Sequence, residues 1–188
     1  TGKTQWEAPF EQVSPLTLTA TSDRVLLHDG KRIHCLTLAD GSPVWESEEL
    51  TVERRLVAEN APTLTVHEDV VLFAWNGTLF SFDLATGKQL WQKGSFSRGD
   101  YRSPASVLVL DGLVWDMNIT NKREDGRLTG FDPRTGEEKR TFAPKGPFKG
   151  MAHHRCYRCR ATKKYVIASR SGVELVDPVK EEWREHFF

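Results

Sequence analysis

The chain has 188 residues, and its 26 lysines and arginines balance its 26 aspartates and glutamates, so the formal net charge at neutral pH is zero. A chain of this length can bury a substantial core, and its charge balance disfavours partners held by bulk electrostatics, such as nucleic acid or an anionic membrane. The sequence contains no apolar run of about 18 residues that could span a bilayer, and its N-terminus lacks the basic and apolar regions of a signal peptide.

From the N-terminus onward, a glycine-containing turn followed by a tryptophan recurs along the chain. The chain opens with Gly2 and Trp6, and the same unit returns as Gly41 with Trp45, Gly87 with Trp91, and Gly136 with Arg140 in place of tryptophan. A worn copy at 173–178 is followed by Trp183 after a turn about two residues shorter. The four glycines are 39, 46 and 49 residues apart, which indicates an internal repeat.

The residues of this unit suit a reversal of the chain followed by packing. Glycine supplies the positive φ of a tight turn, and tryptophan is a large apolar anchor with one polar group that can dock against a neighbouring unit. The predicted docking residues are Trp6, Gly41, Trp45, Gly87, Trp91, Gly136 and Trp183.

Three strands are predicted before each turn, and the segment with the tryptophan gives a fourth. The first strands of the units are 16–20, 63–67, 105–110 and 154–160. The second strands are 24–28, 70–75, 113–118 and 165–169, and the third are 33–38, 79–83, 127–132 and 173–177. Four strands in a repeat of about 40–50 residues are typical of a β-propeller blade, so we predict an all-β propeller of four-stranded antiparallel blades. The predicted blades are 9–48, 49–94, 95–143 and 144–188, and residues 1–8 end a preceding blade.

The turn units resemble the tryptophan-docking repeats of the PQQ-like propeller superfamily, which have the pattern A-x-D-x-x-T-G-x-x-x-W. That superfamily contains quinoprotein alcohol dehydrogenases and BamB-like assembly scaffolds. Because its members close with seven or eight blades, the resemblance implies that about four blades of a larger ring are present. The alternative is a self-closing ring of four blades, with residues 1–8 completing the last one. An open half-ring would expose two blade faces, so we expect remaining blades, a partner chain or self-association of two copies.

The stretch HHRCYRCR brings together four candidate metal ligands, His153, His154, Cys156 and Cys159. Covalent haem attachment is excluded because a histidine would have to follow the second cysteine, where Arg160 stands. Period-two alternation in an extended strand sends the two cysteines to opposite faces, so a shared metal requires a bulge. No helix N-terminus is predicted that would activate a redox pair. The other interpretation is an inner strand with its cysteines in the core and its histidines facing a polar channel.

Residues 150–177 also resemble a segment of large PQQ-like proteins of planctomycete type. In that pattern the second cysteine position more often holds another residue, which weakens Cys159 as a ligand. The resemblance implies that the chain continues past Phe188, and it brings no established reaction.

Two functions remain open from the sequence. The first is a non-catalytic interaction or assembly scaffold; the resemblance implies a bacterial periplasm or cell envelope. The second is part of an oxidoreductase that uses PQQ with Ca²⁺, or a transition metal, with His153, His154, Cys156 and Arg158 at a central channel. Such an enzyme would need carboxylate and amide side chains clustered around the calcium ion. Asp111, Asp116 and Asn118 are instead scattered through one blade and are assigned to turns and strand edges.

Overall fold

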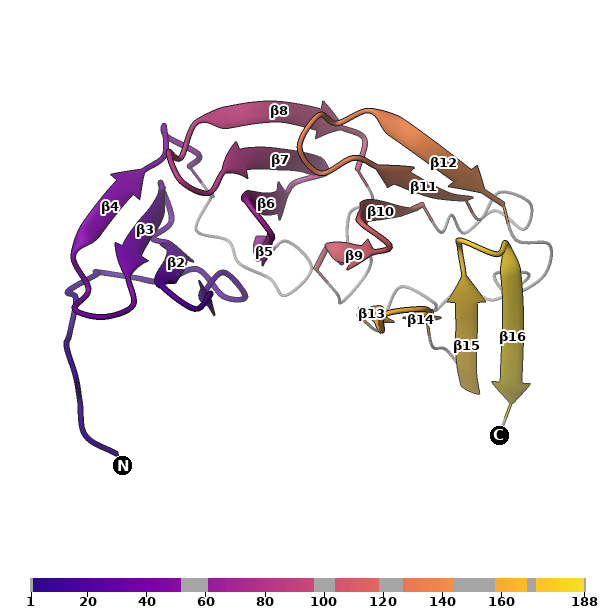
Figure 1. Ribbon diagram of the computed structural model, residues 1–188, viewed down its shortest axis with the longest axis horizontal. Coiled ribbons are helices and arrows are strands. Elements are labelled where there is room, and N and C mark those ends of the chain that lie inside the picture. The colour runs from indigo at the N-terminus through magenta and orange to yellow at the C-terminus, as the bar shows by residue number, and fades with distance from the viewer. Residues whose placement is uncertain are drawn as a thin grey trace.

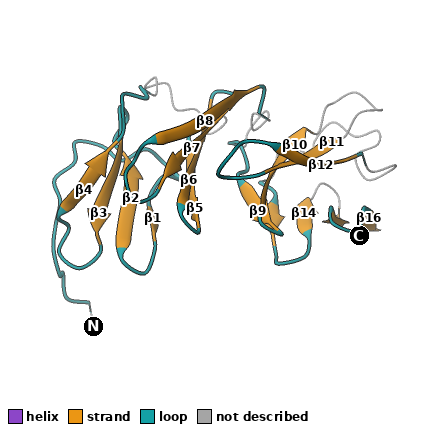
Figure 2. Ribbon diagram, turned by 45° about the horizontal axis from the view of Figure 1, so that its top comes forward, coloured by secondary structure: helices purple, strands orange, loops and turns teal. Residues whose placement is uncertain are grey.

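The computed structural model describes residues 2–51, 61–96, 104–118, 127–143, 158–168 and 172–187. These ranges contain strands, turns and loops (Figure 2), and none of them holds a helix that is long and apolar enough to cross a membrane. Within these ranges, sixteen strands form four four-stranded antiparallel sheets, each from strands consecutive in the chain. The predicted all-β arrangement of propeller blades is confirmed.

We number the sheets 1 to 4 in chain order. Sheet 1 contains β1 (Thr19–Ala20), β2 (Arg24–His28), β3 (Ile33–Thr37) and β4 (Pro43–Glu46). Sheet 2 contains β5 (Thr63–His67), β6 (Val70–Trp75), β7 (Thr78–Asp83) and β8 (Gln89–Gly94). Sheet 3 contains β9 (Leu108–Leu110), β10 (Leu113–Asn118), β11 (Arg127–Phe131) and β12 (Glu138–Phe142). Sheet 4 contains β13 (Arg160–Ala161), β14 (Val166–Ala168), β15 (Gly172–Asp177) and β16 (Glu182–Phe187).

The sheets follow one another along an open arc, with the two ends of the chain at opposite ends of the arc (Figure 1). Sheet 4 has its own outer strand, β16, paired along its length with β15. Residues 2–10 form no strand and do not pair with sheet 4. The arrangement is therefore an open partial propeller, and the alternative of a four-blade ring closed by residues 1–8 is not what this structure adopts.

The second and third strands of each sheet lie within about two residues of their predicted bounds, whereas some first strands are shorter than predicted. The predicted strand 105–110 is reduced to Leu108–Leu110, and 154–160 falls mostly on residues 151–157, which lie outside the described residues. Each first strand lies at the edge of its sheet and pairs with one neighbour only.

The core lies between neighbouring sheets, and the central strand β6 buries side chains on both of its faces. In β6, Val71 and Phe73 pack toward sheet 1 with Leu26 and Ile33, while Leu72 packs on the other face with residues of sheet 3. A third cluster, around Trp115, joins sheet 3 to Val166 and Val176 of sheet 4. Neighbouring sheets are thus held face to face by burial of apolar area.

A shift of register separates three of the outer strands from the fourth. The pairing shifts at Cys35/Leu36 in β3–β4, at Ser81/Phe82 in β7–β8 and at Gly130/Phe131 in β11–β12. The pairing of β15 with β16 runs without a shift. Because side chains alternate between faces, one extra residue in a strand sends every following side chain to the opposite face.

Candidate functional site

The tryptophans that follow the first three turns make contacts with the turn of the next sheet. Each indole Nε1–H donates a hydrogen bond to a backbone carbonyl three residues before a turn glycine. The pairs are Trp6 with Leu38 O at 2.8 Å, Trp45 with Leu84 O at 2.8 Å and Trp91 with Pro133 O at 3.0 Å. We call the place where the residue four positions after one turn glycine contacts the turn of the next sheet a joint.

The glycine in each of these joints lies directly under the indole ring. A Cβ atom would lie 2.6 Å from Trp6 Cε3 at Gly41, 2.5 Å from Trp45 Cε3 at Gly87 and 2.8 Å from Trp91 Cδ2 at Gly136. The three glycines also have φ between +71° and +74°, a conformation that side-chain-bearing residues rarely adopt. The structure therefore places three of the predicted docking tryptophans, Trp6, Trp45 and Trp91, over the turn glycines Gly41, Gly87 and Gly136 of the following units.

The joint between sheets 2 and 3 has further polar contacts. The Ser81 hydroxyl also donates to Pro133 O, at 2.7 Å. Arg134 of sheet 3 contacts two carboxylates of sheet 2, Asp69 at 2.6 Å and Asp83 at 3.1 Å. The pKa of Asp83 is lowered, chiefly by its hydrogen bond with the Thr86 hydroxyl and with a smaller contribution from Arg134. Because Arg134 is half-exposed, these ion pairs add little to stability.

At the joint between sheets 3 and 4 both partners of the tryptophan–glycine pair are replaced. Arg140 stands in the tryptophan position and donates from Nη1 to Val179 O at 3.4 Å. Glu181 takes the glycine position, four residues after Asp177 as Gly136 is four after Asp132, and keeps a left-handed φ of 58°. An arginine side chain is narrower than an indole ring. With arginine in the tryptophan position no ring lies against the turn, so the turn position does not require glycine.

Trp183, predicted as a docking residue, lies on the opposite face from the other docking tryptophans. Trp45 and Trp91 stand opposite Cys35 and Ser81, whereas Trp183 stands opposite Val176 and packs back onto the core between sheets 3 and 4. The reason is the missing register shift in β16.

Over residues 1–169 the sequence matches the family model of the outer membrane protein assembly factor BamB. The chain belongs to the PQQ-like BamB family. The predicted membership of the PQQ-like repeat superfamily is thereby confirmed, and the coarse architecture agrees with it.

Solved structures show how much of a relative this BamB-family chain spans. BamB from Moraxella catarrhalis superposes with a TM-score of 0.63 at 18% identity, over 95% of this chain and 51% of that chain. The designed protein Ika4 superposes with a TM-score of 0.57 at 12% identity, over 100% of this chain and 99% of that chain. A quinohemoprotein alcohol dehydrogenase from Comamonas testosteroni is 33% identical over 101 residues, which are 47% of this chain and 14% of that protein. The chain thus spans about half of the BamB structure and a small part of the dehydrogenase.

Of the four candidate metal ligands in this BamB-family chain, His153, His154 and Cys156 lie outside the described residues. Cys159 is partly buried against the core between sheets 3 and 4, and burial raises the pKa of its thiol to about 11. Cys159 is therefore a neutral thiol in a packed position. Within the described ranges, no three His, Cys, Asp or Glu side chains gather in a way that could hold a metal ion.

One buried polar centre is not apparent from the sequence, in which His28 is only the last residue of the predicted strand 24–28. His28 is fully buried and stacks on Phe73 of sheet 2, with ring centroids 4.9 Å apart. Its Nε2 lies 3.0 Å from Leu50 O, and the Gly30 N–H donates to its Nδ1 at 3.1 Å. A carbonyl only accepts, so Nε2 carries the proton and Nδ1 accepts: the ring is held in the neutral form.

The stability of the fold should fall in mild acid because of His28. Burial lowers the pKa of His28 below its ordinary value. The unfolded chain therefore takes up a proton at a higher pH than the folded chain, so the free energy of unfolding falls as the pH is lowered from about 7 to about 5.5. Urea unfolding across this range, with His28→Gln as the comparison, measures the effect. An equal pH slope in both proteins would contradict it.

Proposed function

We propose that the chain is a non-catalytic propeller segment that acts as a scaffold for protein assembly in the bacterial cell envelope. The observation that carries the proposal is the use of the repeated residues. The tryptophans and glycines that recur along the chain contact one another between sheets and do not converge on a reactive centre. The matched family, an outer membrane protein assembly factor, supports both the assembly role and the location.

In this proposal the joints hold the sheets in an arc whose first and last faces receive further protein. Gly2 has the φ of the joint glycines, +70°, but a Cβ there would meet nothing within 4 Å, so no indole covers it. We propose that the remaining blades of a larger ring, or a partner chain, cover the open faces. The half-length match to the BamB structure supports the larger ring, as does the resemblance of residues 150–177 to long PQQ-like proteins.

Deletion of the gene tests the scaffold role. The expected result is a lower amount of folded outer-membrane protein, restored by the wild-type gene and not by one encoding Gly87→Ala. Unchanged outer-membrane protein in the deletion strain would contradict the proposal, as would PQQ-dependent reduction of a dye by the purified protein.

The alternative is an oxidoreductase that uses PQQ with Ca²⁺, or a transition metal, and the match to the Comamonas testosteroni dehydrogenase favours it. The described residues do not fit such a group. Trp115 is fully buried with its Nε1–H donated to Leu110 O at 3.0 Å, so its ring cannot lie under a quinone. Asp111 is exposed in a left-handed turn, whereas Asp116 is buried. Stoichiometric metal in the purified protein that is lost in His154→Ala would support the alternative.

A further inference from the structure

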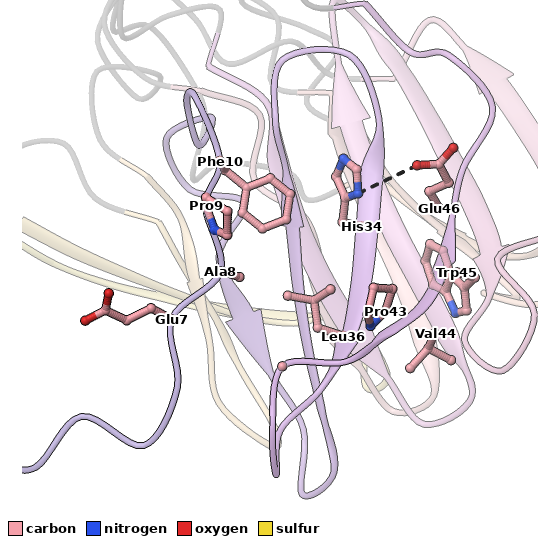
Figure 3. Close-up of a pocket in the computed structure, with 11 residues that line it drawn as sticks. Glu7, Ala8, Pro9, Phe10, His34, Leu36, Pro43, Val44, Trp45 and Glu46 are labelled. Carbon is pink, nitrogen blue, oxygen red and sulfur yellow. Dashed lines mark ion pairs between the residues drawn. The ribbon is translucent and has the colours of Figure 1, made fainter.

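A groove runs along the outer side of the first joint, between residues 7–10 and the strands β3 and β4 (Figure 3). Its volume is about 540 Å³, within the range of sites that bind small ligands or side chains. Phe10 forms one wall, and Leu36 and Pro43 form the base. The groove therefore offers an apolar channel open to solvent.

The same groove recurs at the next joint with a volume of about 510 Å³. The residues of β3 and β4 that line the first groove correspond to residues of β7 and β8 in the second, each 46 residues later. The pairs are His34 with Phe80, Leu36 with Phe82, Gly41 with Gly87, Pro43 with Gln89, and Glu46 with Gln92. The groove is thus a property of the repeat at the outer rim, and not a consequence of the open face of sheet 1.

Two hydrogen-bond acceptors converge at one end of the first groove. His34 Nε2 lies 2.8 Å from Asp29 Oδ2, and because a carboxylate accepts, the Nε2–H donates to it. In the tautomer that this bond selects, Nδ1 has a free lone pair and faces Glu46 Oε2 at 4.0 Å (Figure 3). Arg32 approaches the other oxygen of Glu46, Oε1, at 3.9 Å. An N–H donor placed between Nδ1 and Oε2 would bond to both.

The charges of the two grooves are unbalanced although the chain as a whole is neutral. The first groove is lined by Glu7 and Glu46 and by no lysine or arginine. The side chain of Glu7 points outward (Figure 3), and Arg32, which does not line the groove, stands 3.9 Å from Glu46 Oε1. The second is lined by Glu46, Glu48 and Glu49 against one lysine, Lys88. Glu46 lines both grooves, so a cation-bearing ligand would meet carboxylates along this part of the rim.

We propose that the first groove binds an extended segment of a partner protein that carries a lysine or arginine beside an apolar side chain. The cation lies between His34 Nδ1 and Glu46 Oε2, and the apolar side chain packs against Phe10 and Leu36. The Phe10 ring stands 5.0 Å from the His34 ring, close enough for its face to contact the cation's methylene groups. This inference rests on the proposed scaffold function and specifies the chemistry of the partner.

Two short peptides test the proposal on the whole chain. Acetyl-Gly-Leu-Lys-Phe-Gly-amide should bind saturably in a calorimetric titration, and the peptide with glutamate in place of lysine should not. Glu46→Gln should weaken binding of the lysine peptide about tenfold, since it removes one charge-assisted hydrogen bond. The matched control is Glu182→Gln, an exposed carboxylate on the outer strand of sheet 4, which should leave binding unchanged.

Equal binding of the two peptides would overturn the inference, and so would equal effects of Glu46→Gln and Glu182→Gln. Equally tight binding of n-butylammonium would overturn the choice of a peptide. Urea unfolding of both variants shows whether they are folded, and Phe10→Ala, which removes one wall and no charge, should also weaken binding. If the peptide does not bind but the deletion strain has less folded outer-membrane protein, this inference alone is refuted. If the peptide binds but the deletion strain is unaffected, the proposed function alone is refuted.

Discussion

Replacement of Gly87 by alanine should lower the free energy of unfolding by about 3 kcal/mol. The left-handed φ of +71° costs a side-chain-bearing residue about 1 kcal/mol. The new Cβ would also lie 2.5 Å from Trp45 Cε3, so the indole has to move. That movement breaks the hydrogen bond to Leu84 O and opens the packing at the joint, for about 2 kcal/mol more. Urea unfolding followed by tryptophan fluorescence measures the loss.

Gly112→Ala is the matched control for this prediction. Gly112 also has a φ of +71°, but nothing lies within 4 Å of the position of its Cβ. Its substitution should therefore cost only the conformational part, about 1 kcal/mol. If the two alanine variants were equally stable, the contact between the indole and the glycine would contribute nothing, and the proposed role of the joints would be wrong.

Trp115→Ala should have the largest effect of any single change considered, about 4 kcal/mol. Trp115 has no exposed surface and lies at the centre of the core that joins sheets 3 and 4. Its removal leaves a cavity and loses the hydrogen bond to Leu110 O, and large-to-alanine changes at such sites cost about 3–5 kcal/mol. Because Val166 and Val176 pack on the same cluster, amide exchange in sheet 4 should accelerate as well.

Trp75→Ala gives the comparison for a tryptophan that is only partly buried, at the end of β6. It should cost clearly less, because less apolar surface returns to water and the cavity is open to solvent. Similar losses for the two variants, or unchanged exchange in sheet 4 of Trp115→Ala, would show that the core between sheets 3 and 4 does not hold them together.

The spacing of Gly2, Gly41, Gly87 and Gly136 predicted the repeat, alternation between the turns predicted most strands, and the family was indicated by the resemblance of the turn units. Alternation within a strand and chain reversal at glycine are local properties, so a short window of sequence determines them. The run Val70–Trp75 could likewise be recognised as a strand, although the burial of both its faces depends on a sheet on either side.

The sites depended on contacts that no local pattern reveals. The neutral ring of His28 is fixed by Leu50 O, 22 residues away, and the two acceptors of the groove come from different strands. Trp183 shows the same limit. The sequence predicted a docking tryptophan, but because β15 and β16 pair without a register shift, its side chain packs on the core between sheets 3 and 4.

By itself the sequence determined that this protein is built of four-stranded propeller blades punctuated by glycine and tryptophan. Only the tertiary structure decided which face each outer strand presents, and hence which tryptophans reach the next sheet. The reason is that strand propensity and turn chemistry act over a few residues, whereas register is fixed by pairing and packing between strands. A single extra residue in that pairing changes which sheet the side chain contacts.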